Sequence, residues 1–138
     1  MAHLAEMRLA FEPYAARLAC RHATPRDVEQ MLAHADAMEK ATSQEGFALA
    51  DLAFHMALAE ASKNPFMYSV GALVEAALVT SFRLSSPFGE AARQSMSADN
   101  HRRIAQAIQL KDEAKAAAAV EVVIAEGRDR VGLKLGEA

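Results

Sequence analysis

Apolar residues recur along most of this chain at the spacing of amphipathic helices. Near the amino end, apolar side chains three and four residues apart share one helical face; they are Leu4, Met7, Phe11, Tyr14 and Leu18. A wider apolar surface covers residues 66–84 and consists of Val70, Leu73, Val74, Ala77, Leu78 and Phe82. This width predicts a helix that is buried on more than one side or that forms a subunit interface.

Turn-forming residues divide the chain into predicted helices. Thr24-Pro25 is an N-cap followed by proline at the first helical position, and Asn64-Pro65 ends a helix because proline moves the preceding residue out of the α region. Residues 85–89 form the longest irregular stretch. We interpret Ser97 to Asn100 as a cap and Lys111-Asp112 as the turn before the last helix. The predicted helices are 4–22, 25–41, 44–62, 66–84, 97–109 and 112–134, with a short helical piece around 89–95.

The connections between these helices are short, so neighbouring helices should pack antiparallel in a bundle. The chain has 138 residues, 52% of them hydrophobic and 24% charged, which suits one globular domain over residues 1–138. Alanine, leucine and other strong helix formers occur in almost every window. The expected fold class is therefore all-α.

Charge and cysteine content restrict the partners of the chain. The net charge of −3 provides no basic field for phosphate backbones, so we expect no direct nucleic acid binding. The single cysteine, Cys20, excludes an internal disulfide and fits a small buried hydrophobe in a reducing compartment. No apolar run approaches the length of about 20 residues that spans a bilayer, and Glu6 and Arg8 interrupt any signal-like segment. The expected location is cytoplasmic, without membrane contact.

Two polar residues lie on the apolar face of the third predicted helix. Asp51 and His55 are four residues apart, so they share that face with Phe47, Phe54 and Leu58. A buried carboxylate costs several kcal/mol unless it is paired or bound to a metal. The pattern therefore predicts a partner for Asp51 inside the bundle.

A third polar residue of this kind is His101, which shares the inward face of its helix with Ile104 and Ile108. Two interpretations remain open at this point. Asp51 and His55 form a buried ion pair, with His101 bonded to a carbonyl elsewhere, or the three side chains hold a divalent metal or an anionic ligand in a cavity.

Four segments resemble one known family. Residues 51–64 (DLAFHMALAEASKN) resemble D-x-x-F-H-x-x-[IL]-x-x-A-[SA]-x-N, and residues 6–19 (EMRLAFEPYAARLA) resemble E-x-R-x-x-[LF]-E-x-x-A-A-x-L-A. Residues 97–108 (SADNHRRIAQAI) are similar to S-x-x-x-H-x-x-I-x-x-A-[IL], and 111–114 (KDEA) to a G-D-x-x-A turn. These are the motifs, in order, of the FadR C-terminal domain, or FCD, of bacterial GntR-type transcription regulators.

The resemblance implies an antiparallel bundle of six or seven helices that encloses an internal ligand cavity and pairs into a homodimer. It also implies that DNA is bound only through a winged helix-turn-helix that precedes this domain and that this sequence does not contain. Many family members hold Zn or Ni through Asp, His, His and His, and a small carboxylate effector completes the coordination. Asp51, His55 and His101 match the first three ligands, whereas Val123 stands at the fourth.

Three further residues are candidates for effector binding. Arg8 lies near the inward face that the resemblance implies, although pairing with Glu12 one turn later is an equally good interpretation. Arg83 ends an apolar helix, where capping of the last carbonyls is the alternative. Asn64 matches the family motif, although Asn before Pro is also a common turn residue.

The expected function is therefore that of an effector-sensing and dimerisation domain with no catalytic activity. Two alternatives remain, a small metalloenzyme with an Asp/His/His site and a purely structural dimerisation module. Against the enzyme, the sequence shows no convincing general base, phosphate loop or nucleophile motif.

Overall fold

The computed structural model describes residues 2–73 and 75–136, which form seven α-helices and contain no strand. The helices are α1 (Ala2–His22), α2 (Pro25–Lys40), α3 (Gln44–Ala61), α4 (Pro65–Leu73), α5 (Glu75–Ser85), α6 (Ala91–Gln109) and α7 (Glu113–Leu135). The all-α bundle that the sequence predicts is thus confirmed.

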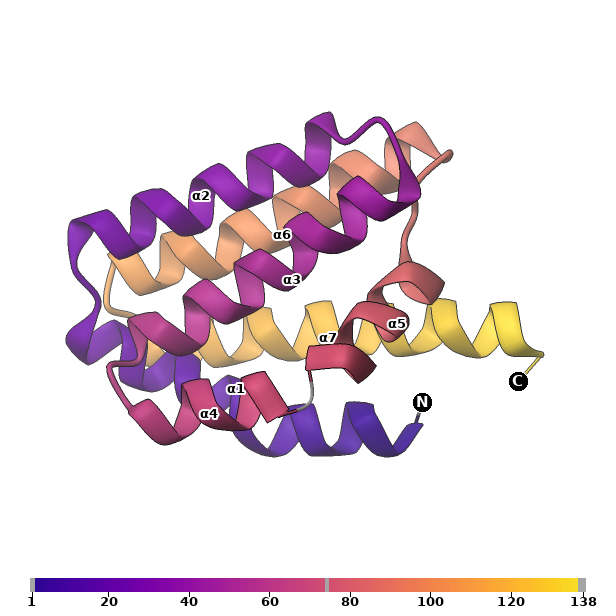
Figure 1. The fold of residues 1–138 in the computed structure, drawn as a ribbon. Coiled ribbons are helices and arrows are strands. Elements are labelled where there is room, and N and C mark those ends of the chain that lie inside the picture. Colours follow the sequence, from indigo (N-terminus) through magenta and orange to yellow (C-terminus); the bar gives the residue numbers. More distant parts are fainter. Residues whose placement is uncertain (1, 74, 137–138) are drawn as a thin grey trace.

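The long helices pack in antiparallel pairs (Figure 1). Helix α2 packs on α3 and α6, α1 packs on α7, and α6 joins these two groups through its contact with α7. The short helix α4 lies against α3, and α5 packs on both α3 and α7. The centre of the bundle is therefore enclosed by α1, α3, α5, α6 and α7.

Two apolar clusters fill most of the interior. The larger one joins α1, α2, α3, α6 and α7, with Phe54 and Ile104 among its fully buried members. The smaller one, which includes Leu52 and Phe82, lies under α5. The ring of His55 lies between the two clusters. Its centroid is 5.7 Å from the ring centroid of Phe54 and 5.2 Å from that of Phe82.

Four predicted helices match the observed ones to within two residues at each end, and two predictions are wrong. The expected helix 66–84 is two helices, α4 and α5, and Val74 lies outside the described residues. The division lets α4 stay on α3 while α5 turns onto α7. The expected helices 89–95 and 97–109 are one continuous helix, α6, so Ser97 is not a cap.

Tertiary contact explains the continuity of α6. The amide of Gln94 donates hydrogen bonds to the carbonyl oxygens of Met38 at 3.0 Å and Ala41 at 3.1 Å, at the end of α2. These bonds hold the first turns of α6 in place, although its N-cap, Glu90, makes no capping hydrogen bond with its side chain. Packing therefore outweighs the local capping preference of residues 97–100.

None of the described helices is by itself long and apolar enough to span a membrane. The bent pair Pro65–Leu73 and Ala77–Ser85 meets the requirement by length and composition only.

The start of α2 is a complete capping box. Asp27 N donates to the Thr24 hydroxyl at 3.1 Å, and Thr24 N donates to the Asp27 carboxylate at 2.8 Å. Lys63, at the end of α3, forms an ion pair with the same carboxylate at 2.8 Å. Burial raises the pKa of Asp27, but the bonds from Lys63 and Thr24 outweigh burial and lower it below 3.8.

We expect Asp27→Ala to reduce stability by about 1 kcal/mol at neutral pH, because the cap loses one of its two bonds. A lowered folded-state pKa means that the carboxylate stabilises the fold above the unfolded-state value and loses this effect as pH falls through the folded-state value. The difference in Tm between the natural chain and Asp27→Ala should therefore shrink below about pH 4. Asp27→Asn, which keeps an acceptor for Thr24 N, is the control and should lose less; a pH-independent difference would contradict the assignment.

Candidate functional site

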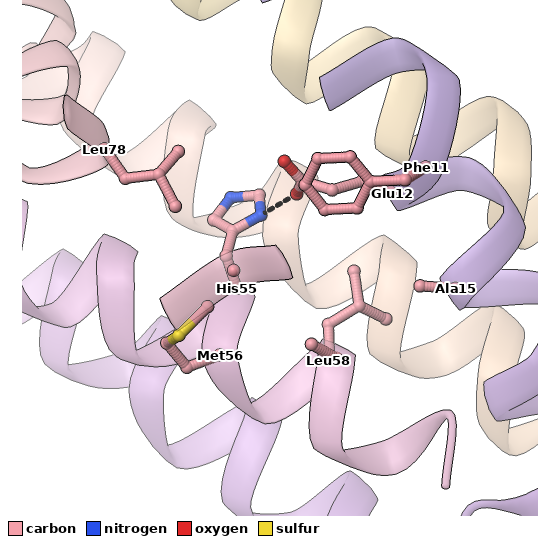
Figure 2. Close-up of a pocket in the computed structure, with 9 residues that line it drawn as sticks. Phe11, Glu12, Ala15, His55, Met56, Leu58 and Leu78 are labelled. Atoms are coloured by element: carbon pink, nitrogen blue, oxygen red, sulfur yellow. Dashed lines mark hydrogen bonds and ion pairs between the residues drawn. The ribbon is translucent and has the colours of Figure 1, made fainter. Parts of the chain in front are cut away.

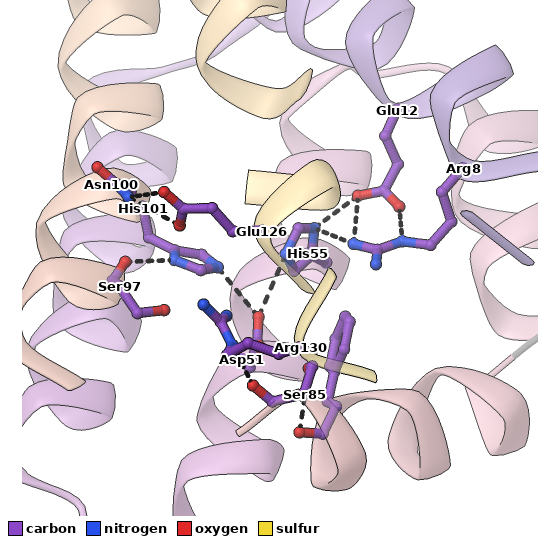
Figure 3. A network of polar contacts seen from close by, with 11 residues as sticks. Arg8, Glu12, Asp51, His55, Ser85, Ser97, Asn100, His101, Glu126 and Arg130 are labelled. Atoms are coloured by element: carbon purple, nitrogen blue, oxygen red, sulfur yellow. Dashed lines mark hydrogen bonds and ion pairs between the residues drawn. The ribbon is translucent and has the colours of Figure 1, made fainter. Parts of the chain in front are cut away.

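Asp51, His55 and His101 meet in the centre of the bundle. Asp51 and His55 come from adjacent turns of α3, and His101 reaches them from α6. One ligand atom from each side chain lies within 4.8 Å of the others, and all three side chains are at least 92% buried. We call these three residues the triad (Figure 3).

The ring of His101 is oriented by the backbone of its own helix. Its Nδ1 lies 2.7 Å from the carbonyl oxygen of Ser97, an acceptor, so Nδ1 carries the hydrogen. Its Nε2 lies 3.0 Å from Asp51 Oδ1. In a neutral ring this nitrogen presents a lone pair to the carboxylate, so a proton or a metal ion is needed between them.

The ring of His55 is oriented by α1. Its Nδ1 lies 2.5 Å from the Glu12 carboxylate and 3.4 Å from the Arg8 guanidinium. The carboxylate contact is the shorter one, and only an N–H suits it, so Nδ1 donates to Glu12. The opposite nitrogen, Nε2, is 3.2 Å from Asp51 Oδ1 but in poor hydrogen-bond geometry, and it is the one sealed side-chain atom of the described residues without a hydrogen-bond partner.

Neighbouring charges keep both carboxylates ionised. Burial raises the pKa of Glu12, but Arg8 and His55 outweigh burial and bring it to about 2. The pKa of Asp51 is likewise raised by burial and then lowered further by His101 and His55, to well below its usual range. Burial lowers the pKa of His55, whereas Glu12 and Asp51 raise it to a net value above 6.5.

The triad fits a divalent metal ion. Ligands on a tetrahedral Zn²⁺ lie about 3.3 Å apart, from metal–ligand bonds of about 2.0–2.1 Å, close to the 3.0 and 3.2 Å that separate the two Nε2 atoms from Asp51 Oδ1. Both imidazoles already donate their other nitrogen to an oxygen, as metal-binding histidines usually do. A metal would also satisfy the orphaned Nε2 of His55. Asp51, His55 and His101 are thus close enough together to hold a metal ion.

Val123, at the fourth family position, is buried in the larger apolar cluster together with Phe54. The ring of Phe54 contacts His101 at 4.9 Å between centroids and His55 at 5.7 Å. The protein side chains of the triad therefore supply three ligand atoms, and an apolar wall stands where the family motif has a histidine.

The structure separates the three candidate effector residues. Arg8 lies at the site, but it is buried in an ion pair with Glu12 and its guanidinium lies 4.9 Å from the Phe82 ring centroid. Arg83 is half-exposed and pairs with Glu45 at 2.7 Å, away from the triad.

Asn64 is a turn residue. Its side-chain oxygen accepts a hydrogen bond from Phe66 N at 2.9 Å at the start of α4. The structure thus does not bring Asn64 or Arg83 to the triad, and the turn interpretation of Asn64 is the one that the contacts support.

A small apolar pocket reaches the site from the α1, α3, α4 and α5 side (Figure 2). Its walls are Phe11, Glu12, Ala15, His55, Met56, Leu58, Ala59, Gly71 and Leu78. The space inside is about 10 Å³, roughly that needed by one water molecule. Gly71 contributes to this tight fit, because a Cβ there would lie 2.4 Å from Met56 Cε. A metabolite would need helix or side-chain movement to enter from this side.

Sequence reasoning missed two residues of the site. Glu12 appeared only as a surface partner of Arg8, because both residues lie beside the predicted apolar stripe of α1, of which Met7 and Tyr14 are exposed. The signal that could have found Glu12 is the alanine face of α1 (Ala5, Ala15 and Ala19), which Arg8 and Glu12 share and which is the buried one. Arg130 on α7 was not considered; it lies two turns after Val123 and therefore on the same face.

Comparison with known proteins agrees with this arrangement. The family model described as FCD domain matches residues 3–126, and a search of curated proteins found no match. The match contains all three triad residues and both members of the Arg8–Glu12 pair. Because it spans well over half of the sequence, the chain belongs to the FCD domain family, the effector-binding regulatory domains of GntR-type regulators.

Proposed function

We propose that this chain senses a small carboxylate metabolite, which it binds inside the bundle through a divalent metal, Zn or Ni, held by Asp51, His55 and His101. The observation that carries the proposal is the convergence of two oriented imidazole nitrogens on one carboxylate oxygen, with His55 Nε2 left without a hydrogen-bond partner. The metal would supply a positive centre with open coordination positions for an effector oxygen.

The residues around the triad support a binding role over a catalytic one. Glu12 is a further carboxylate in contact with the triad, and it is occupied by Arg8 and His55. A general base must be free to take a proton from substrate. A sensor, in contrast, needs only a preorganised site whose occupancy favours one conformation over another.

Regulation follows if the effector binds one geometry of a homodimer better than the other. We propose that α5 carries this change, since it packs on both α3, which bears two of the triad residues, and α7. A DNA-binding domain attached to the dimer would then experience an altered spacing of its two half-site contacts.

Metal binding by two variants tests the proposal. We expect the natural chain to bind Zn²⁺ or Ni²⁺ stoichiometrically in calorimetry and elemental analysis, and His101→Ala to lose this binding with its helix content unchanged in circular dichroism. His3→Ala removes a histidine whose side chain is 99% exposed and should bind as the natural chain does. Equal metal binding by His101→Ala, or none by the natural chain, would overturn the metal assignment.

A further inference from the structure

Arg130 is a cation at the triad without a carboxylate partner. It lies on α7, and its Nε donates a hydrogen bond to the carbonyl oxygen of Ser85 at the end of α5 (Figure 3). Among the described residues, no carboxylate lies within ion-pair distance of its guanidinium, and its two terminal nitrogens, Nη1 and Nη2, make no hydrogen bond.

The acidic residues near Arg130 have other partners. Both oxygens of Glu126 accept from the Asn100 amide at 2.9 Å. Asp51 acts on Arg130 electrostatically, but its Oδ1 faces the two histidines of the triad. Burial lowers the pKa of Arg130, with Glu126 and Asp51 opposing this effect, yet a guanidinium stays protonated throughout.

The free end of Arg130 is not sealed in the core. Of the buried side-chain nitrogens and oxygens of the described residues, only His55 Nε2 is both sealed and without a partner. The two terminal nitrogens of Arg130 and the Oδ2 of Asp51, which likewise has no hydrogen bond, therefore touch solvent-accessible space. The terminal nitrogens of Arg130 thus lie beside the triad with no protein partner among the described residues (Figure 3).

A guanidinium with two parallel free N–H groups matches the two oxygens of a carboxylate. We propose that Arg130 binds an oxyanion of the effector with these two groups while the triad metal takes an oxygen of the same anion. This inference rests on the proposed function. The effector would then be held at two points, by the metal and by Arg130. Arg130 would give α7 a contact with the effector, although Val123 on the same helix replaces the fourth family histidine.

The position of Arg130 also connects the anion to the fold. The hydrogen bond from Arg130 Nε to the Ser85 carbonyl links α7 to the end of α5. The two helices also lie close together at Gly127, one turn before Arg130, where a Cβ atom would be in van der Waals contact with Ser85, at 3.7 Å from its Cβ. An anion that engages the terminal nitrogens would hold Arg130 and its Ser85 bond in one arrangement. The ligand would thereby couple α5 and α7 to the triad on α3 and α6.

The test uses the full chain loaded with Zn²⁺ and titrated separately with acetate, succinate, citrate and inorganic phosphate. We expect at least one carboxylate to bind, and Arg130→Gln to weaken that binding by about tenfold or more, as for loss of a charged hydrogen-bond pair. Arg130→Lys keeps the positive charge but not the two parallel N–H donors of the guanidinium, so its anion affinity should lie between those of the natural chain and Arg130→Gln. Zn²⁺ affinity, measured first without anion, should stay within about threefold in both variants.

Arg128→Gln is the matched control, because Arg128 lies on the same helix and its half-exposed side chain pairs with Asp129. It should leave anion affinity unchanged. Equal anion binding by Arg130→Gln and the natural chain, or no binding of any carboxylate by the Zn²⁺-loaded natural chain, would overturn the role of Arg130. Binding of phosphate alone would overturn the carboxylate assignment. Failure of the natural chain to bind Zn²⁺ would instead overturn the proposed function, and the bridging anion with it.

Discussion

Val123→His should destabilise the metal-free chain and be rescued by Zn²⁺. Without metal, the variant buries an imidazole in the larger apolar cluster, and an unsatisfied buried polar group costs about 1–3 kcal/mol. For a domain of this size that corresponds to a fall in Tm of roughly 3–12 °C. With Zn²⁺ present, the new imidazole stands at the position of the family's fourth ligand. Binding should then tighten by about tenfold or more, equivalent to about 1.4 kcal/mol.

Val120→His provides the matched control for this experiment. Val120 lies one turn earlier on α7, is fully buried and belongs to the same apolar cluster. It should destabilise the metal-free chain to a similar extent, but added Zn²⁺ should not restore its Tm. If Val123→His behaves like Val120→His in the presence of Zn²⁺, Val123 does not stand at a fourth ligand position, and metal binding by the triad gains no support from the family motif.

The triad was predictable from the sequence because burial follows helical periodicity. Asp51 and His55 are spaced by one turn on a stripe that includes Phe54, and His101 shares a face with Ile104, so all three had to point inward. The structure confirms their burial and brings them together. Periodicity cannot give the distance between two helices, however, so the approach of His101 on α6 to Asp51 and His55 on α3 could be seen only in the structure.

The Arg8–Glu12 pair could not be resolved from the sequence for a related reason. An arginine four residues before a glutamate is a common surface pair, and α1 has apolar and polar residues on neighbouring faces. In the structure the pair is buried because α3 and α5 cover it with His55 and Phe82. The same limit applies to Arg130, whose burial depends on the approach of α5 to α7.

Capping residues in the sequence predicted the helix ends correctly where a side chain caps the helix. They predicted a helix end wrongly where contacts with another helix determine how far the helix extends. Thr24 and Asp112 cap α2 and α7 as their residue types indicate. Ser97 has the same local preference, yet it lies within α6, because Gln94 anchors the preceding turn to the end of α2. A residue that caps well in isolation therefore does not break a helix that is fixed on both sides.

Glu12→Ala should be the most destabilising single substitution at the site. It removes the one carboxylate that compensates the buried guanidinium of Arg8 and accepts the Nδ1 hydrogen of His55. Breaking a buried ion pair by deleting one partner costs about 3–5 kcal/mol. We expect a loss of this size in chemical denaturation. A loss below about 1 kcal/mol, the range of a surface ion pair, would contradict the buried pairing.

A double variant separates the structural role of Glu12 from its role in orienting His55. Arg8→Leu combined with Glu12→Leu removes both buried charges, and such replacements are often neutral or stabilising, so most of the lost stability should return. Metal affinity should stay reduced by about 10–100-fold, because the hydrogen-bond partner of a ligating histidine is still missing. Recovery of stability together with full Zn²⁺ affinity would show that Glu12 only neutralises Arg8. Recovery of stability alone would show that the pair on α1 also positions the metal ligand on α3.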